Sequence, residues 1–467
     1  MNNVPLFFPR PGGDIASMPI ASHRNRLDTT GSGQILELPL EFQEPPPRHA
    51  SAAPAPRSTD LARDLAAFRE FGQETRQLVT RAASFAGEPL EVPAYVNEYW
   101  TARQRQASSL HEVSYRACFK PQLPRFFIER LTAPGDRVYD PFMGRGTTPV
   151  EAALLGRVPV GCDVNPLSLT FARPRLRPPG LHAVADRLGA IPMADHDEFP
   201  EELLTFYHAD TLKQICSLKK YLFGRRASGG FDSIDDWIAL VALNRLTGHS
   251  AGFFSVYTLP PNQAVSVKSQ LRINEKRNQV PPPRNVAKII LKKSKQLLGD
   301  VTAPVRDTLR SVAEEALLIT SPAHATPRIA SDSIDLVVTS PPFLDVVQYD
   351  ADNWLRCWFL GIDPKSVNIT MPRKLDQWQA TMTQVFHELA RVLKPGGHVA
   401  FEVGEVHGGK TKLEEAVLPC GFDAKLEPLL VLINDQEFTK TANCWGVDNM
   451  SKGTNTNRIV VFRKRAG

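Results

Sequence analysis

The stretch 138–148, Val-Tyr-Asp-Pro-Phe-Met-Gly-Arg-Gly-Thr-Thr, limits most strongly what this chain can fold into. Its short apolar start predicts a strand that ends in Asp140, and Gly144 and Gly146 predict a tight turn into a helix over 149–155. Glycines have no Cβ, so the backbone can approach a ligand closely, and the N–H groups at the start of the helix face it. We therefore predict a ligand-binding corner between a strand and a helix.

Features that the stretch lacks exclude some classes of ligand for this corner. No Lys-Ser/Thr pair follows the glycines, as a phosphate-cradling loop requires, and the spacing differs from the dinucleotide-binding Gly-x-Gly-x-x-Gly. The carboxylate of Asp140 would repel a pyrophosphate but suits a cationic or hydroxyl-rich ligand. A second apolar run ends in Asp163, where a strand–helix–strand unit usually places an acid on a ribose. A ribose with a positive centre describes S-adenosylmethionine.

A second motif lies downstream, where a strand predicted over 334–339 runs into Ser-Pro-Pro-Phe at 340–343. Together with the motif at 140–148, it resembles the motifs of DNA amino-methyltransferases, which methylate N4 of cytosine or N6 of adenine. The resemblance covers about residues 115–175 and 315–465. It implies S-adenosyl-L-methionine as the cofactor and DNA, with the target base swung out of the duplex, as the partner.

The resemblance also implies which residues form the site. The implied catalytic residues are Ser340, Pro341, Pro342 and Phe343. The implied cofactor-binding residues are Lys120, Asp140, Pro141, Phe142, Gly144, Gly146, Thr147, Thr148 and Asp163. The alternative for Lys120 is an ordinary surface lysine. No metal is indicated, because the transfer needs none.

The Ser-Pro-Pro-Phe motif suits an exocyclic amine, whose lone pair is delocalised into the base. The Ser340 hydroxyl and the Pro341 carbonyl can accept the two amine hydrogens and return the lone pair to nitrogen. Phe343 offers a flat face for the extruded base. Many adenine-specific relatives have Asp or Asn at the first position, so Ser340 favours N4 of cytosine. The alternative reading of the motif is a turn that merely ends a strand.

Composition sets wider limits on the chain. Its 467 residues exceed one ordinary core, its net charge is +5, and its six cysteines show neither disulfide nor zinc-ligand spacing. No run of eighteen apolar residues and no signal peptide is present, so we expect a cytoplasmic protein with no membrane partner.

Four parts are predicted along the chain. Residues 1–57 are rich in proline and are expected to be disordered, and residues 58–114 are expected to form a helical segment with an apolar stripe from Leu61 to Leu78. Residues 115–165 and 315–467 should form a Rossmann-like α/β methyltransferase domain with a seven-stranded sheet, whose later strands include 316–320, 429–433 and 458–462. Residues 166–314 should be a mainly helical insertion.

The insertion contains a basic tract between Ser266 and Leu298, with nine lysines and arginines against the single acid Glu275. Such a density of one sign is unfavourable on a compact surface unless it meets an anion. The tract therefore predicts nucleic-acid contact and target recognition. The alternative is a solvated lysine-rich helix.

Three functional hypotheses remain open from the sequence. The first is a DNA methyltransferase that prefers cytosine N4, the second an RNA exocyclic-amine methyltransferase, and the third a nucleic-acid-binding protein with a retained but inactive cofactor pocket. The recognition sequence, a companion restriction endonuclease and the oligomeric state are also open.

Overall fold

The computed structural model describes residues 60–101, 107–116, 118–194, 198–259, 264–342, 349–367, 374–406, 411–435 and 456–466. The chain divides into two compact units, Met1–Ala52 and Ala53–Gly467, and every described residue belongs to the second. The stretch 1–57, for which disorder is predicted, lies outside the described residues.

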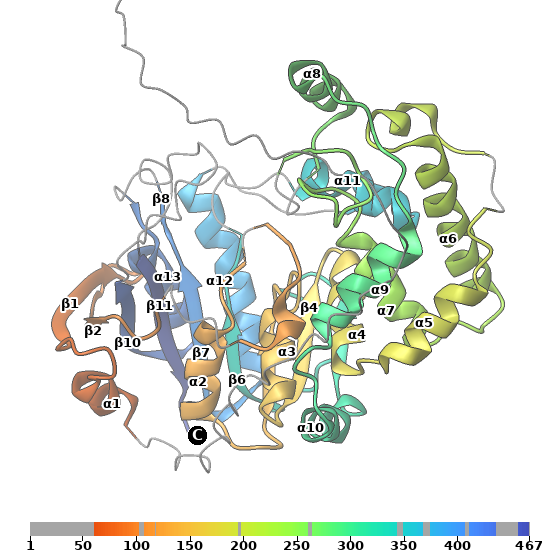
Figure 1. Cartoon of the computed structure of the whole chain (residues 1–467). Coiled ribbons are helices and arrows are strands. Elements are labelled where there is room, and N and C mark those ends of the chain that lie inside the picture. Colours follow the sequence, from red (N-terminus) through yellow and green to blue (C-terminus); the bar gives the residue numbers. More distant parts are fainter. Residues whose placement is uncertain are drawn as a thin grey trace, which may run out of the picture. The chain divides into compact units, whose positions relative to one another are not determined.

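A nine-stranded mixed sheet runs through the described part of the chain in the order β1-β2-β10-β11-β7-β6-β3-β4-β5 (Figure 1). Its strands are β1 (Arg76–Ala83), β2 (Pro89–Asn97), β3 (Arg137–Asp140), β4 (Val158–Asp163), β5 (Leu317–Thr320), β6 (Ile334–Thr339), β7 (Leu393–Val403), β10 (Leu426–Asp435) and β11 (Thr456–Lys464). A separate two-stranded ribbon consists of β8 (Glu405–Val406) and β9 (Thr411–Lys412).

The direction in which the chain crosses the sheet reverses at β3. Strands β7, β6, β3, β4 and β5 are parallel neighbours, and the chain passes from β3 outward to β5 before it returns to β6 on the other side of β3. Ligands bind such sheets at the carboxyl ends of the strands beside the reversal. Asp140 ends β3 and Thr339 ends β6, so the two sequence motifs meet at this point.

Helices cover both faces of the sheet. Their bounds are α1 (Leu61–Ala67), α2 (Gln122–Leu131), α3 (Thr147–Leu154), α4 (Leu167–Leu176), α5 (Leu181–Ala190), α6 (Ala209–Ala227), α7 (Ser233–Leu243), α8 (Val267–Arg277), α9 (Val286–Leu297), α10 (Ala303–Ala313), α11 (Tyr349–Leu360), α12 (Leu375–Val392) and α13 (Leu413–Asp423). Short 3-10 turns occupy Ser109–His111, Glu201–Thr205 and Pro364–Ser366.

Neighbouring residues of a strand point to opposite faces, and β3 shows the result. Val138 packs in the cluster that includes Phe127 of α2, whereas Tyr139 packs in the cluster that includes Phe386 of α12. Both residues of β3 are fully buried, so the central strand that carries Asp140 is fixed between two apolar layers.

The helices of the stretch 166–314 share a core of their own around Trp237 of α7. Most of α7 is buried, and the described helices α4 to α10 account for this stretch, which belongs to the same compact unit as the sheet. Within the described residues, no helix combines the length and apolar character needed to cross a bilayer.

The α/β class is confirmed, but two predictions about the sheet need correction. The helical prediction for 58–114 holds for α1 only, because the stripe from Leu61 to Leu78 continues past Gly72, which has φ of 81°, into β1. Leu78 lies on an edge strand, 53% exposed, where a helix would have buried it. β1 and β2 therefore extend the predicted seven-stranded sheet to nine strands.

Candidate active site

A cavity lies at the carboxyl ends of β3, β4 and β6, where both sequence motifs contribute to its wall. The predicted residues that line it are Pro141, Phe142, Gly144, Asp163, Ser340 and Pro342. Four residues that the sequence did not single out also line it, namely Tyr115, Val164, Asn165 and Ala323. The structure thus brings the proposed cofactor motif and the proposed catalytic motif to one cavity.

Asp163 lines the cavity and is held there by the backbone. Its carboxylate accepts hydrogen bonds from the N–H groups of Gly144 and Asn165, each at 2.8 Å. Burial raises the pKa of Asp163. Gly144 adopts φ of 48°, a conformation that glycine reaches without strain. The two backbone donors orient an acceptor group toward the cavity, as a hydroxyl-bearing ligand requires.

Asp140 does not line the cavity, although the sequence suggested a ligand contact. The side chain is 1% exposed, and Oδ1 accepts hydrogen bonds from the Thr339 hydroxyl at 2.6 Å and from the Phe142 N–H at 3.1 Å. Burial raises the pKa of Asp140 to about 7. Its position indicates that Asp140 fastens the two motifs to each other from behind the cavity wall.

Thr147 and Thr148 also point into the protein. Thr148 donates from Oγ1 to the carbonyl of Val338 at 3.1 Å, which ties α3 to β6. Thr147 accepts at Oγ1 from Nε of Arg145 at 3.1 Å. Both threonines are buried, and neither is among the residues that line the cavity.

Gly146 serves the backbone turn. It has φ of 80°, and a Cβ added there would lie 2.6 Å from Cβ of Ala172 on α4. A larger residue would therefore both strain the turn and push the loop away from α4.

Arg145 lies between the two glycines of the motif, and its bonds fix a neighbouring segment. Its guanidinium donates to the carbonyl of Val113 at 2.7 Å. Its own carbonyl accepts from the buried Arg175, which also donates to the carbonyl of Leu110 at 3.1 Å. These bonds hold the segment that carries Tyr115 against the glycine loop.

The remaining predicted residues divide into three cases. Lys120 is exposed and does not line the cavity, although burial of part of its side chain lowers its pKa. Pro341 is buried, and the carbonyl of the next residue, Pro342, accepts from Nε1 of Trp378 at 3.0 Å. Phe343, which was predicted to stack on the target base, lies outside the described residues.

Glu402 is a candidate site residue that the sequence analysis did not single out. It lies on β7, is 7% exposed, and its carboxylate accepts from the Ser340 hydroxyl and, at 2.5 Å, from Nδ2 of Asn457. Burial raises the pKa of Glu402 to about 7. The sequence pattern that could have indicated Glu402 is a single acid within the apolar run Phe401-Glu402-Val403. A buried strand rarely contains a charged residue unless that residue has a partner.

Comparisons with known proteins indicate similarity to DNA methyltransferases. A family model described as "DNA methylase", for N6/N4 methyltransferases, matches residues 45–172, which include the Asp140 motif. The chain is also 24% identical over 330 residues to the type II methyltransferase M.BsoBI of Geobacillus stearothermophilus, over 63% of this chain and 60% of that protein. Residues 45–172 are thus similar to the N6/N4 DNA methylase family. This similarity implies S-adenosyl-L-methionine as the methyl donor.

Other relatives match over shorter stretches. The type II methyltransferase M2.DpnII of Streptococcus pneumoniae is 44% identical over 59 residues, 12% of this chain and 22% of that protein. The chain thus spans about 60% of the length of M.BsoBI and much less of M2.DpnII. Among solved structures, the rRNA methyltransferase AviRa of Streptomyces viridochromogenes is 13% identical, with 79% of this chain and 96% of that chain covered and a TM-score of 0.30.

The lining of the cavity fits the methyl donor of this family. Phe142, Val164 and Ala323 supply apolar wall, and Asp163 supplies an acceptor that the backbone holds in place. A sulfonium nucleoside has a flat ring, which an apolar wall can accommodate, and a hydroxyl-rich sugar, which the Asp163 carboxylate can bind.

Proposed function

We propose that this chain transfers a methyl group from S-adenosyl-L-methionine to an exocyclic amine of a DNA base, with N4 of cytosine as the preferred target. One observation carries the proposal, namely that residues of the cofactor motif and of the Ser-Pro-Pro motif line the same cavity. The match of residues 45–172 to the N6/N4 DNA methylase family supports it. The preference for cytosine rests on Ser340, where adenine-specific members often have Asp or Asn.

The residues of the Ser-Pro-Pro turn would position the target amine. The Pro342 carbonyl already accepts from Trp378, whereas the Pro341 carbonyl accepts no hydrogen bond from the described residues. We therefore assign to the Pro341 carbonyl and the Ser340 oxygen the two hydrogens of the amine. Rigid acceptors of this kind act by orienting the amine and by stabilising the charge that develops on it.

Glu402 would remove the proton that the amine must lose. Its carboxylate accepts from the Ser340 hydroxyl, so the Ser340 oxygen can take an amine proton while its own proton passes to Glu402. Asn457 donates from Nδ2 to the same carboxylate. The bound donor supplies the methyl group, whose bond to sulfur breaks as its bond to nitrogen forms, and the sulfonium charge is lost.

The basic tract would contact the DNA backbone. Lys268, Arg272 and Lys276 are exposed and follow one another at four-residue spacing, so they lie on one side of α8. In Figure 1, α8 lies toward the same end as β8, which follows the carboxyl end of β7. Lys293 differs, because it is buried and pairs with Glu112 at 3.3 Å. This arrangement supports DNA contact by α8.

The same proposal includes a companion restriction endonuclease as a partner of this chain. The relatives M.BsoBI and M2.DpnII are named type II methyltransferases. Plasmid DNA from cells that express this chain should then resist at least one nuclease of a restriction-enzyme panel. Resistance to none of them would argue against protection of a restriction site.

The central experiment uses tritiated cofactor with duplex DNA and, separately, with RNA. Label in DNA, followed by digestion and mass identification of N4-methylcytosine, is the expected result. Label in RNA alone would favour the RNA methyltransferase, and cofactor binding without label would favour the inactive nucleic-acid-binding protein. If the digest contains N6-methyladenine, the proposed methylation of an exocyclic amine stands, but the preference for cytosine is wrong.

A further inference from the structure

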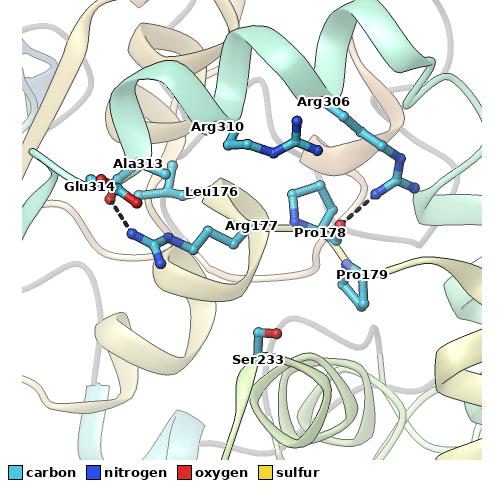
Figure 2. Close-up of a pocket in the computed structure, with 9 residues that line it drawn as sticks. All are labelled: Leu176, Arg177, Pro178, Pro179, Ser233, Arg306, Arg310, Ala313 and Glu314. Carbon is cyan, nitrogen blue, oxygen red and sulfur yellow. Dashed lines mark hydrogen bonds between the residues drawn. The ribbon is translucent and has the colours of Figure 1, made fainter.

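A second cavity of about 290 Å³ lies between the end of α4, the start of α7 and α10 (Figure 2). Its volume is close to the lower bound of roughly 300 Å³ for small-molecule sites. α4 runs back from the carboxyl end of β4, and α10 leads into the amino end of β5. This second cavity therefore lies at the amino ends of the strands, whereas the active-site cavity lies at their carboxyl ends.

Three arginines line the second cavity, and two of them are held in place by a reciprocal contact. Arg177 donates from Nη2 to the carbonyl of Ala313 at the end of α10, at 3.1 Å. Arg306 of α10 donates from Nη1 to the carbonyl of Pro178, just beyond α4. Each guanidinium has five N–H donors and uses one of them on described residues. The remaining donors are oriented before any ligand arrives, which lowers the cost of binding.

The charges around the second cavity favour an anion. Arg310 is four residues from Arg306 on the same side of α10, where like charges repel. Arg310 pairs with Asp307 at 3.0 Å, but neither Arg177 nor Arg306 has a carboxylate within ion-pair distance among the described residues. One carboxylate, that of Glu314, also lines the cavity and makes no ion pair in the described part of the chain.

The acids at the start of α7 do not cancel this charge, because each is already paired. Asp232 and Asp235 pair with Arg187 and Arg225, and Asp236 pairs with Arg173. Ser233, the first residue of α7, faces the cavity with a hydroxyl group (Figure 2). The first N–H groups of α7 are already capped by the Asp232 carboxylate, so the attraction for an anion comes from the arginines.

We propose that the second cavity binds a phosphate-type oxyanion, either free or as the phosphate group of a small phosphorylated molecule. Guanidinium groups match such an oxyanion with paired, charge-assisted hydrogen bonds. Arg177 and Arg306 bind its oxygens from two sides, and the Ser233 hydroxyl donates to a third. This site is separate from methyl transfer, so its failure would leave the proposed function untouched.

Calorimetric titration of the full chain tests this site with two probes, inorganic phosphate and adenosine monophosphate, at constant ionic strength. We expect saturable binding of at least one probe, with a Kd of about 1 mM or lower. Binding of phosphate alone identifies a free anion, and tighter binding of the monophosphate identifies a phosphorylated molecule. The double variant Arg177→Gln/Arg306→Gln should weaken binding at least tenfold.

The matched control is Arg328→Gln, because Arg328 is an exposed arginine with no hydrogen bond to described residues. The Arg328→Gln variant should bind the probes with the same affinity as wild type. Unchanged binding of S-adenosyl-L-methionine shows that the double variant is folded. If it does not fold, Arg310→Gln, which removes only the pair with Asp307, should still weaken binding about threefold. No saturable binding of either probe, or equal affinity in all variants, overturns the site. A double variant that loses affinity for duplex DNA while neither probe binds would also overturn it.

Discussion

The carboxylate of Asp140 accepts a 2.6 Å hydrogen bond from the hydroxyl of Thr339, and this bond joins the end of β3 to the end of β6. Asp140 directly precedes Pro141, and Thr339 directly precedes Ser340, so the bond links the cofactor motif to the catalytic motif. Thr148 adds a second link through the carbonyl of Val338. The spacing between the two motifs at the cavity is thus set by buried contacts behind its wall.

Removal of the Thr339 hydroxyl should weaken both halves of the site. Thr339→Val leaves the buried Asp140 carboxylate without this donor, which should cost about 1–3 kcal/mol of unfolding free energy. Denaturant titration should show the loss, and methylation kinetics should show a lower kcat together with weaker cofactor binding. Thr339→Ser, which keeps the hydroxyl, should recover most of both. A valine variant with wild-type kinetics would show that the link does not position the motifs.

Replacement of the Ser340 hydroxyl should affect the reaction and spare the cofactor. Ser340→Ala removes one acceptor for the amine and the route to Glu402, so kcat should fall about 10²–10³-fold. The Kd for S-adenosyl-L-methionine, measured by calorimetry, should stay within about threefold of wild type. Single-turnover methylation by the alanine variant at the wild-type rate would defeat the proposed mechanism.

The rate of methyl transfer should depend on pH through Glu402. Only the deprotonated carboxylate can accept a proton, and burial raises the pKa of Glu402 to about 7, so the rate should rise as pH increases through about 7. Glu402→Gln should lower the rate by about 10²-fold and remove this limb of the pH profile.

Asp140 provides the control for that profile, because burial raises its pKa to about 7 as well although it does not line the cavity. Asp140→Asn should retain the limb. If the limb persists in Glu402→Gln but disappears in Asp140→Asn, the titrating group is Asp140 and our assignment to Glu402 is wrong.

Alanine substitutions at two glycines with similar φ angles should distinguish the cost of backbone strain from the cost of side-chain crowding. Gly135 has φ of 87° with no atom within 4 Å of an added Cβ, whereas Gly146 has φ of 80° and an added Cβ would lie 2.6 Å from Cβ of Ala172. Gly135→Ala should cost about 1–2 kcal/mol of unfolding free energy from backbone strain. Gly146→Ala should cost about 1–3 kcal/mol more from overpacking. Equal midpoints of thermal unfolding for the two variants would contradict the close approach of the loop to α4.

DNA affinity should depend on the exposed side of α8. The triple variant Lys268→Gln/Arg272→Gln/Lys276→Gln should weaken duplex binding and reduce the slope of log K against log salt by about 2–3, because each phosphate contact contributes about 0.9. Fluorescence anisotropy over a salt series measures the slope. The charge-matched control Arg63→Gln/Arg76→Gln/Arg81→Gln, on α1 and β1, should leave it unchanged. Equal salt slopes for the two triple variants would show that α8 does not contact the DNA backbone.

The fold was predictable where local signals agree with the final structure. The apolar run before Asp140, the two glycines and the run before Ser340 are short-range patterns, and they correctly predicted β3, α3 and β6. The pairing of β1 with β2 was missed, because Leu78 completes an apolar stripe with helical spacing and the break at Gly72 is a single residue.

The roles of individual side chains depended on contacts that spacing does not encode. Asp140 and Thr148 lie in the cofactor motif, yet each bonds a residue of β6 that is almost two hundred positions away. Glu402 reaches Ser340 only after β7 has paired with β6. The motif predicted which segments meet, whereas tertiary packing decides which side chains face the cavity.

The strand order also constrains how the chain can be assembled. β2 reaches the rest of the sheet only through β10 and β11, which lie between it and β7. The hairpin of β1 and β2, although early in the sequence, therefore joins the sheet only after the strands Leu426–Asp435 and Thr456–Lys464 have been synthesised. During translation, the edge of β2 that pairs with β10 has no strand partner until the ribosome has added more than three hundred further residues.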